Sequence, residues 1–169
     1  MRSLADQRAI LGIDPTKRGL AFVFFEGGRL LDWGTRRPRG KGFGAFEAIL
    51  NLCPADVIVL EDATALGCER RPKMGRLLAL LARTAEAKGL VVVKVSRFDV
   101  RRGWTLRGVT RKHAVATAIA EDFPVLEPSV PRPRKSYMDE EARVQVFDSA
   151  SLVLHVFGTV ASDSFAARA

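Results

Sequence analysis

Two acidic residues in this sequence each end an apolar run. Asp14 closes ILGID, residues 10–14, and Glu61 closes VIVLE, residues 57–61. A carboxylate inside a sheet is costly unless it is paired, solvated or bound to a metal. Two of them at the C-terminal ends of neighbouring strands would lie close together, and a divalent cation would relieve their repulsion. The alternative is that both acids only mark where strands emerge into water. Asp62 is a weaker candidate, because adjacent residues on a strand point to opposite faces.

A third acid lies in the last strongly apolar segment. Polar residues recur there at i, i+4, i+7 and i+14, namely Glu141, Gln145, Asp148 and His155. On a helix this spacing makes one stripe. The stripe is either the solvent face of the helix or the face that points Asp148 at the other two acids, and the pattern alone leaves both interpretations open.

The elements that must position these acids follow from the apolar periodicity. It predicts strands over residues 9–14, 20–26, 29–35, 56–62 and 90–95, the last two buried, with Gly27-Gly28 as a hairpin turn. It predicts helices over residues 43–53, 73–89, 110–123 and 138–157, with Thr110 as the N-cap of the third and Gly158 as the end of the last. Three meandering strands followed by alternating helices and strands predict a single α/β domain over residues 1–158. Its mixed five-stranded sheet has three antiparallel and two parallel strands and carries helices on both faces. Residues 159–169 are predicted to form a flexible tail.

Composition limits the class of protein. The chain has 169 residues, 47% of them hydrophobic and 27% charged, which is typical of a globular domain. No run approaches the length of a membrane span, and MRSLADQR at the N-terminus lacks the apolar stretch of a signal peptide. Cys53 and Cys68 make neither a disulfide framework nor a zinc site. We therefore expect a cytoplasmic protein without a membrane partner.

The charge is the most informative term of the composition. Lys and Arg number 27 against 19 Asp and Glu, which gives a net charge of +8. Residues 94–112 contain seven basic residues and one acid, and shorter basic clusters cover residues 36–41 and 131–135. All three clusters are expected in loops or at the ends of elements, where phosphate contacts do not disturb a core. This balance favours a polyanionic partner.

Four motifs resemble one known family. ILGIDP, VIVLED, RKHAVATAIAEDFP and VFDSASLVLHVF resemble, in this order, segments of the RNase H-like superfamily and, within it, of the RuvC-type Holliday junction resolvases. The resemblance covers roughly residues 9 to 158. It implies an RNase H-like fold, catalytic roles for Asp14, Glu61 and Asp148, and a position close to DNA for Lys112.

The resemblance also implies a cofactor. Family enzymes hydrolyse phosphodiesters with two Mg²⁺ or Mn²⁺ ions, so that Asp14 would bridge both ions while Glu61 and Asp148 would hold one each. Two features depart from the family pattern. Gln145 stands where the family has an aspartate or histidine, and the turn after the first motif reads TKRG. Gln145 is a neutral oxygen ligand, so the second metal is expected to bind weakly.

The expected partner is nucleic acid, with DNA of branched or otherwise structured form favoured. The residues expected to contact phosphates are Arg107, Arg111, Lys112, Arg101, Arg102, Arg36, Arg37 and Lys41. A Holliday junction as substrate would require a homodimer, because paired cuts need two symmetric sites. The main alternative is an RNase H-like nucleic-acid-binding or assembly protein that cuts weakly or not at all. A third hypothesis takes GIDPTKRG as the phosphate-binding turn of an actin-like protein or a sugar kinase. It is disfavoured, because those proteins need two domains of this kind and the chain is too short for both.

Overall fold

One mixed sheet organises the fold. The computed structural model describes residues 8–17, 19–37, 44–68, 70–132 and 144–165, with side chains described as far as residue 158. The sheet order is β3-β2-β1-β4-β5. Strands β1 (Ala9–Thr16), β2 (Gly19–Glu26) and β3 (Arg29–Arg36) form an antiparallel meander, and β4 (Val57–Glu61) and β5 (Val91–Val95) are parallel to β1. This is the sheet that the sequence predicts.

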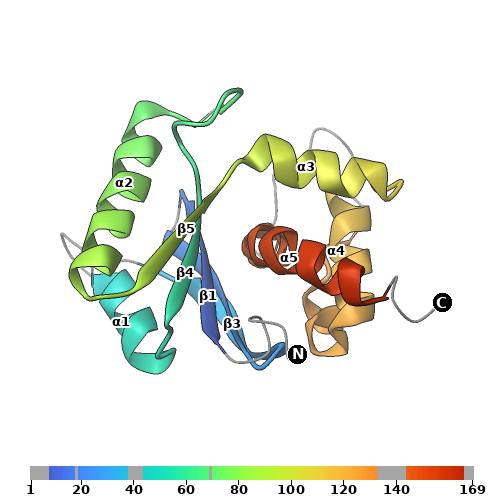
Figure 1. The fold of residues 1–169 in the computed structure, drawn as a ribbon, viewed down its shortest axis with the longest axis horizontal. Coiled ribbons are helices and arrows are strands. Elements are labelled where there is room, and N and C mark those ends of the chain that lie inside the picture. Colours follow the sequence, from blue (N-terminus) through green and yellow to red (C-terminus); the bar gives the residue numbers. More distant parts are fainter. Residues whose placement is uncertain (1–7, 18, 38–43, 69, 133–143, 166–169) are drawn as a thin grey trace.

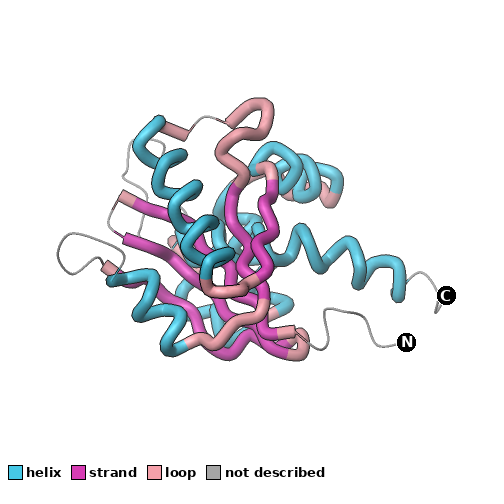
Figure 2. The backbone as a smooth tube through the Cα atoms, turned by 60° about the vertical axis from the view of Figure 1, so that its left-hand side comes forward, coloured by secondary structure: helices cyan, strands magenta, loops and turns pink. Residues whose placement is uncertain are grey.

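Helices cover both faces of this sheet (Figure 1). Helices α1 (Gly44–Leu52) and α2 (Pro72–Ala87) lie on one face, and α3 (Arg97–Leu106), α4 (Lys112–Asp122) and α5 (Val144–Phe165) lie on the other. A short 3₁₀ segment, η2 (Pro124–Ser129), follows α4. Figure 2 shows the strands as one twisted layer between the helices. In the described part of the chain, no helix has the length and apolar composition that crossing a membrane requires.

Strand alternation divides the core into two clusters and decides which side chains face the site. Leu11 and Ile13 pack on the α1 and α2 side, whereas Ile10 of the same strand packs on the α5 side. On β4, Ile58 and Leu60 belong to the first cluster, and Val59 belongs to the second. Because side chains alternate along a strand, Asp14 and Glu61 both fall on the α5 side, and Asp62 falls on the opposite one.

The hairpin between β2 and β3 is confirmed. Gly27 and Gly28 have φ angles of 55° and 73°, which is the left-handed pair of a two-residue turn. Asp14 lies inside β1 rather than at its end, since pairing with β2 continues to Thr16, opposite Gly19. The parallel pairing of β1 with β4 nevertheless stops at Ile13 and Leu60.

Four expectations about the elements are wrong. Residues 97–106 form helix α3, which was expected to be basic loop. Its few apolar residues include Val100 and Trp104, one turn apart, and the Ser96 hydroxyl caps its N-terminus by accepting the Asp99 amide at 3.4 Å. Helix α4 is capped at Arg111 without a side-chain hydrogen bond, so Thr110 is not its cap.

The other two errors concern β5 and α5. Strand β5 is an edge strand rather than a buried one, and Val91 is 49% exposed. Helix α5 continues past Gly158 to Phe165, because a single glycine inside a helix costs only about 1 kcal/mol. The domain boundary after residue 158 stays a prediction.

Helix α5 approaches β1 closely at Gly12. A Cβ atom on Gly12 would lie 2.5 Å from Val153 Cγ2 and 2.9 Å from the Ser149 carbonyl oxygen, both on α5. Ser149 also donates its hydroxyl to the Ala21 carbonyl oxygen of β2 at 3.1 Å. The glycine in the first motif thus sets the distance between α5 and the sheet, and with it the position of the neighbouring Asp148.

We expect Gly12→Ala to lower the free energy of unfolding by about 1 to 3 kcal/mol, because the methyl group overpacks against a backbone oxygen. Gly75→Ala on α2 is the matched control, since its Cβ would meet only the Ala63 side chain at 3.7 Å. That change should leave stability unchanged or raise it by up to about 1 kcal/mol. Urea unfolding of both variants measures the difference, and equal stability of the two would contradict the close approach.

Candidate active site at the ends of β1 and β4

The two strand-borne acids lie side by side and are buried. The register of β1 and β4 ends with Ile13 opposite Leu60, so the next residues on the two strands are Asp14 and Glu61. Each is only 3% exposed. The expectation that these acids merely mark strand ends in water is therefore wrong, because both carboxylates are inside the protein.

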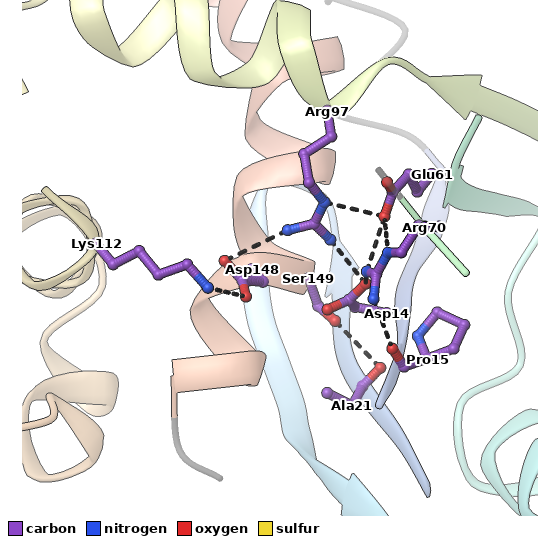
Figure 3. A network of polar contacts seen from close by, with 9 residues as sticks. All are labelled: Asp14, Pro15, Ala21, Glu61, Arg70, Arg97, Lys112, Asp148 and Ser149. Carbon is purple, nitrogen blue, oxygen red and sulfur yellow. Dashed lines mark hydrogen bonds and ion pairs between the residues drawn. The ribbon is translucent and has the colours of Figure 1, made fainter. Parts of the chain in front are cut away.

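Two arginines hold this carboxylate pair (Figure 3). Arg70 donates from Nη2 to Asp14 Oδ1 and from Nε to Glu61 Oε2, the latter at 2.8 Å. Arg97 donates from Nη2 to Asp14 Oδ1 at 2.8 Å and from Nε to Glu61 Oε2 at 2.9 Å. Both guanidinium groups thus end on the same two oxygen atoms. Arg70 comes from the segment between β4 and α2, and Arg97 is the first residue of α3.

Asp148 is joined to this pair through Arg97. Its Oδ1 lies 3.7 Å from Arg97 Nη1, and its Oδ2 lies 3.4 Å from Lys112 Nζ at the start of α4. Figure 3 shows Asp148 pointing from α5 toward the strand ends rather than away from the sheet. The residues that face one another here are three acids, Asp14, Glu61 and Asp148, and three bases, Arg70, Arg97 and Lys112. We call the three acids the acid cluster.

Burial and charge act against each other at this cluster. Burial raises the pKa of Asp14 to about 6, although Arg97 and Arg70 both pull that pKa downward. Asp148 and Glu61 raise it further by repulsion. Burial disfavours the charge on Arg97, but the attraction of Asp14, Asp148 and Glu61 outweighs this cost and raises the pKa of Arg97. The positive charge of Arg97 and Arg70 beside Asp14 therefore opposes the effect of burial on its pKa.

The side chains have the donor chemistry of a site for Mg²⁺ or Mn²⁺. The acid cluster supplies only carboxylate oxygens, which suit hard cations. Gln145, one turn before Asp148 on α5, has a buried Oε1 with no hydrogen-bond partner among the described residues. The cations that already contact Asp14 and Glu61 are guanidinium groups. As the side chains stand, no three His, Cys, Asp or Glu residues in the described ranges are grouped closely enough to hold a metal ion.

The basic residues near the acid cluster lie mostly on helices. Arg101, Arg102 and Arg107 are exposed on and just beyond α3, and Arg111 and Lys112 begin α4. The Arg107 guanidinium lies over the Trp104 ring, 4.8 Å from its centroid. These residues were expected in loops or at the ends of elements. That placement is wrong for Arg101 and Arg102, which lie inside α3, but Arg107, Arg111 and Lys112 do lie at helix ends.

The remaining basic positions lie elsewhere. Arg36 and Arg37 are exposed at the end of β3, the strand at the edge of the sheet opposite β5. Lys41 and most of the 131–135 cluster lie outside the described residues, as does Glu141. His155, the last residue of the polar stripe, packs against α3. A Cβ atom placed on Gly103 of α3 would lie 3.4 Å from the Nδ1 of His155.

A cavity adjoins the acid cluster. It has a volume of about 220 Å³ and lies between α3, α4 and α5. Apolar side chains, among them Trp104 and Phe147, form part of its wall. Arg97, Arg101, Lys112 and Asp148 also line it. A polyanion that approaches the acid cluster from this side therefore meets cationic groups first.

Comparisons with known proteins agree with this arrangement at the level of the fold. No family model and no curated protein matches the sequence. Solved structures do match. The Thermus thermophilus RuvC structure aligns with a TM-score of 0.58 at 16% identity, over 90% of this chain and 96% of RuvC. The fold is RNase H-like, of the RuvC type.

Two further structures support the RuvC-type fold. T. thermophilus RuvC in complex with a Holliday junction substrate aligns with a TM-score of 0.59, at 16% identity over the same shares of both chains. The yeast mitochondrial Holliday junction resolvase Ydc2 aligns with a TM-score of 0.56 at 13% identity, over 89% of this chain and 77% of that one. At such identities the likeness establishes the fold alone.

Sequence reasoning found the acids but missed Arg70 and Arg97. A signal was available for Arg97. It comes just after β5, and Glu61 is the last residue of β4; because the two strands are parallel neighbours, their ends lie at the same edge of the sheet. No pattern in the sequence pointed to Arg70. Its role depends on the path of the segment between β4 and α2, which apolar periodicity does not describe.

Proposed function

We propose that this protein is a metal-dependent endonuclease that hydrolyses phosphodiester bonds in structured nucleic acid, with branched DNA such as a Holliday junction as the favoured substrate. The observation that supports it most is the convergence of Asp14, Glu61 and Asp148 from β1, β4 and α5, with Lys112 beside them. The sequence predicted that Asp14 and Glu61 would lie close together, and it left open whether Asp148 faces them. The RuvC-type fold accords with this function, since one of the matching structures is bound to a Holliday junction.

The proposed cofactor is Mg²⁺ or Mn²⁺, with a second ion bound more weakly than the first. Asp14 would contact both ions, Glu61 and Asp148 would hold one each, and Gln145 would offer a neutral oxygen. When bound, such ions supply an activated water and stabilise the leaving oxygen. The work of the chain itself is to hold the carboxylates in place and to keep them ionised, which the neighbouring bases do.

Binding of the substrate is assigned to the basic groups around the cavity. Lys112 and Arg101 line the cavity beside Asp148, so each can hold a phosphate next to the acid cluster. Arg102, Arg107 and Arg111 extend the positive surface along α3 and α4. Arg36, Arg37 and Lys41 are proposed as more distant contacts. Paired cleavage of a four-way junction would require two copies of the chain, so a homodimer belongs to this proposal.

A second candidate function is that of a nucleic-acid-binding protein that does not cut. The arginine pair on Asp14 and Glu61 favours it, because the carboxylates are already neutralised by the protein itself. Gln145 favours it as well, since the neutral amide does not add to the attraction for a cation. A cleavage assay distinguishes the two functions, because both predict binding and only one predicts a product.

We expect Asp148→Asn to abolish cleavage while affinity for nucleic acid changes by less than about threefold, because binding depends on the basic groups. The substrates are a four-way junction, a flap, a duplex, a single strand and an RNA–DNA hybrid, each with Mg²⁺ and with Mn²⁺. Asp99→Asn is the matched control, since Asp99 is an exposed acid on α3 that does not contact the acid cluster. A wild-type chain that cuts none of these substrates would contradict the nuclease and leave the binding protein.

We expect the triple change of Arg107, Arg111 and Lys112 to Glu to weaken binding of all sequences alike. Phosphate contacts carry no base information, and each lost contact lowers the slope of log affinity against log salt by about one. Affinity should fall by about a hundredfold or more near 0.1 M salt. Fluorescence anisotropy over a salt series measures both quantities.

The matched control for this triple change reverses Lys73, Arg76 and Arg83 to Glu. These exposed bases lie on α2, on the opposite face of the sheet. The net charge changes by the same amount, so a protein that binds through its α3 and α4 side should lose much less affinity. Equal losses in the two variants would refute the assigned binding surface.

We expect Gln145→Asp to lower the metal concentration needed for half-maximal cleavage, because the new carboxylate adds a negative charge one turn before Asp148 on α5. The wild-type chain should need high Mg²⁺ or should prefer Mn²⁺, which accepts mixed ligands more readily. Gln145→Glu is the control, because it adds the same negative charge but keeps the side-chain length of Gln145. A metal titration of the cleavage rate tests this, and an unchanged midpoint in both variants would speak against Gln145 as a ligand.

A further inference from the structure

We propose that Arg97 is a permanent counterion of the acid cluster and Arg70 a displaceable one, so that the cluster takes a single divalent cation and takes it in exchange for Arg70. The proposal rests on the proposed function in one respect only, which is that the acid cluster is the place where a cation binds. It differs from that function in the number of ions, because Arg97 replaces the weaker second ion. It adds two residues to the site and assigns a different role to each.

The argument begins with the shared oxygens. Both guanidinium groups donate to Asp14 Oδ1 and to Glu61 Oε2. A cation that bridges the two carboxylates through these two oxygens would share them with both guanidinium groups and would bring further positive charge to the same place. An arginine and a divalent cation therefore compete for this position, and at least one guanidinium group must leave when the cation enters.

The two arginines differ in how firmly the fold holds them. Their side chains are almost equally exposed, at 20% for Arg97 and 23% for Arg70, so the difference lies in the backbone that carries them. Arg97 is the first residue of α3, directly after the Ser96 cap. It also faces Asp148, so it contacts all three members of the acid cluster. Withdrawal of Arg97 would leave the three acids with one base fewer. Helix α3, which carries Arg97, cannot move without disturbing Val100 and Trp104 in the core.

Arg70 is held more loosely. It lies outside helix and strand, in the segment between β4 and α2, where Leu66 is 97% exposed and Gly67 has a φ of 78°. Besides the two carboxylates, its guanidinium contacts the Pro15 carbonyl oxygen at 3.3 Å. Its side chain can turn outward into solvent without unfolding an element, so it is the arginine that a cation displaces.

The charges favour one cation over two. The acid cluster carries three negative charges, and Arg70, Arg97 and Lys112 balance them. After Arg70 leaves, one divalent cation with Arg97 and Lys112 gives four positive charges against three, which a bound phosphate offsets. A second divalent cation would raise the sum to six positive charges, and Gln145 adds none to oppose it. Arg97 thus occupies the electrostatic place of a second metal.

The test counts bound Mn²⁺ on the full chain without nucleic acid, by electron paramagnetic resonance of free Mn²⁺ during a titration. Wild type should bind one Mn²⁺ per chain. Arg70→Gln should bind one Mn²⁺ about tenfold more tightly, because no exchange is needed. Arg97→Gln should bind two. Arg71→Gln and Arg76→Gln are the matched controls and should match wild type, since both are exposed and neither contacts Asp14 or Glu61.

Thermal unfolding gives a second measurement and detects variants that fail to fold. Arg97→Gln should unfold at a lower temperature than wild type, because buried carboxylates lose a partner. Saturating Mn²⁺ should restore more of its stability than it adds to wild type. If Arg97→Gln does not fold, Arg97→Lys keeps the charge and should bind one Mn²⁺.

Two Mn²⁺ ions on the wild-type chain, or an affinity that Arg70→Gln leaves unchanged, would overturn the proposal. So would a single Mn²⁺ on folded Arg97→Gln, or two on Arg97→Lys. These readings are independent of cleavage. A chain that cuts nothing but shows the expected Mn²⁺ pattern refutes the nuclease and keeps the exchange. A chain that cuts its substrate and binds two ions refutes the exchange and keeps the nuclease.

Discussion

The structure depends on pairing two adjacent buried carboxylates with positive charge. Asp14 and Glu61 lie next to each other at the end of the parallel pairing of β1 and β4, where water does not solvate them. Such a pair is tolerated only with positive charge at contact distance. Arg70 and Arg97 supply it, and Asp148 and Lys112 extend the alternation of charges outward (Figure 3). The segment after β4 and the beginning of α3 are therefore parts of the site as much as the strands are.

The remainder of the fold serves to bring these groups together. Strand alternation turns Asp14 and Glu61 to the α5 side, and Gly12 lets α5 approach β1 closely enough for Asp148 to face them. Helices α3 and α4 then enclose a cavity whose walls include Arg101 and Lys112. Arg70, Arg97 and Lys112 balance the charge of the acid cluster, and Arg101 adds positive charge beside it, a distribution that attracts polyanions.

The RuvC-type fold and the chemistry of the site are separate findings. The fold is shared with T. thermophilus RuvC at only 16% identity. The functional argument therefore depends on the residues of this chain alone. In this chain Gln145 is neutral, and two arginines hold the innermost pair of carboxylates. Under the proposed exchange, this site holds one cation beside built-in counterions.

The sequence by itself determined the sheet, its meander and its parallel strands, because strand periodicity and turn glycines are local properties. It also placed Asp14 and Glu61 on adjacent strands, since the order of elements implied that pairing. It could not identify α3, whose apolar residues are too few to give a helical signal, nor choose between the two faces of α5 for Asp148. Only the tertiary structure decided that Arg70 and Arg97 meet the acids. A long side chain ends several ångströms from its backbone, so its partners depend on how distant segments pack rather than on local sequence.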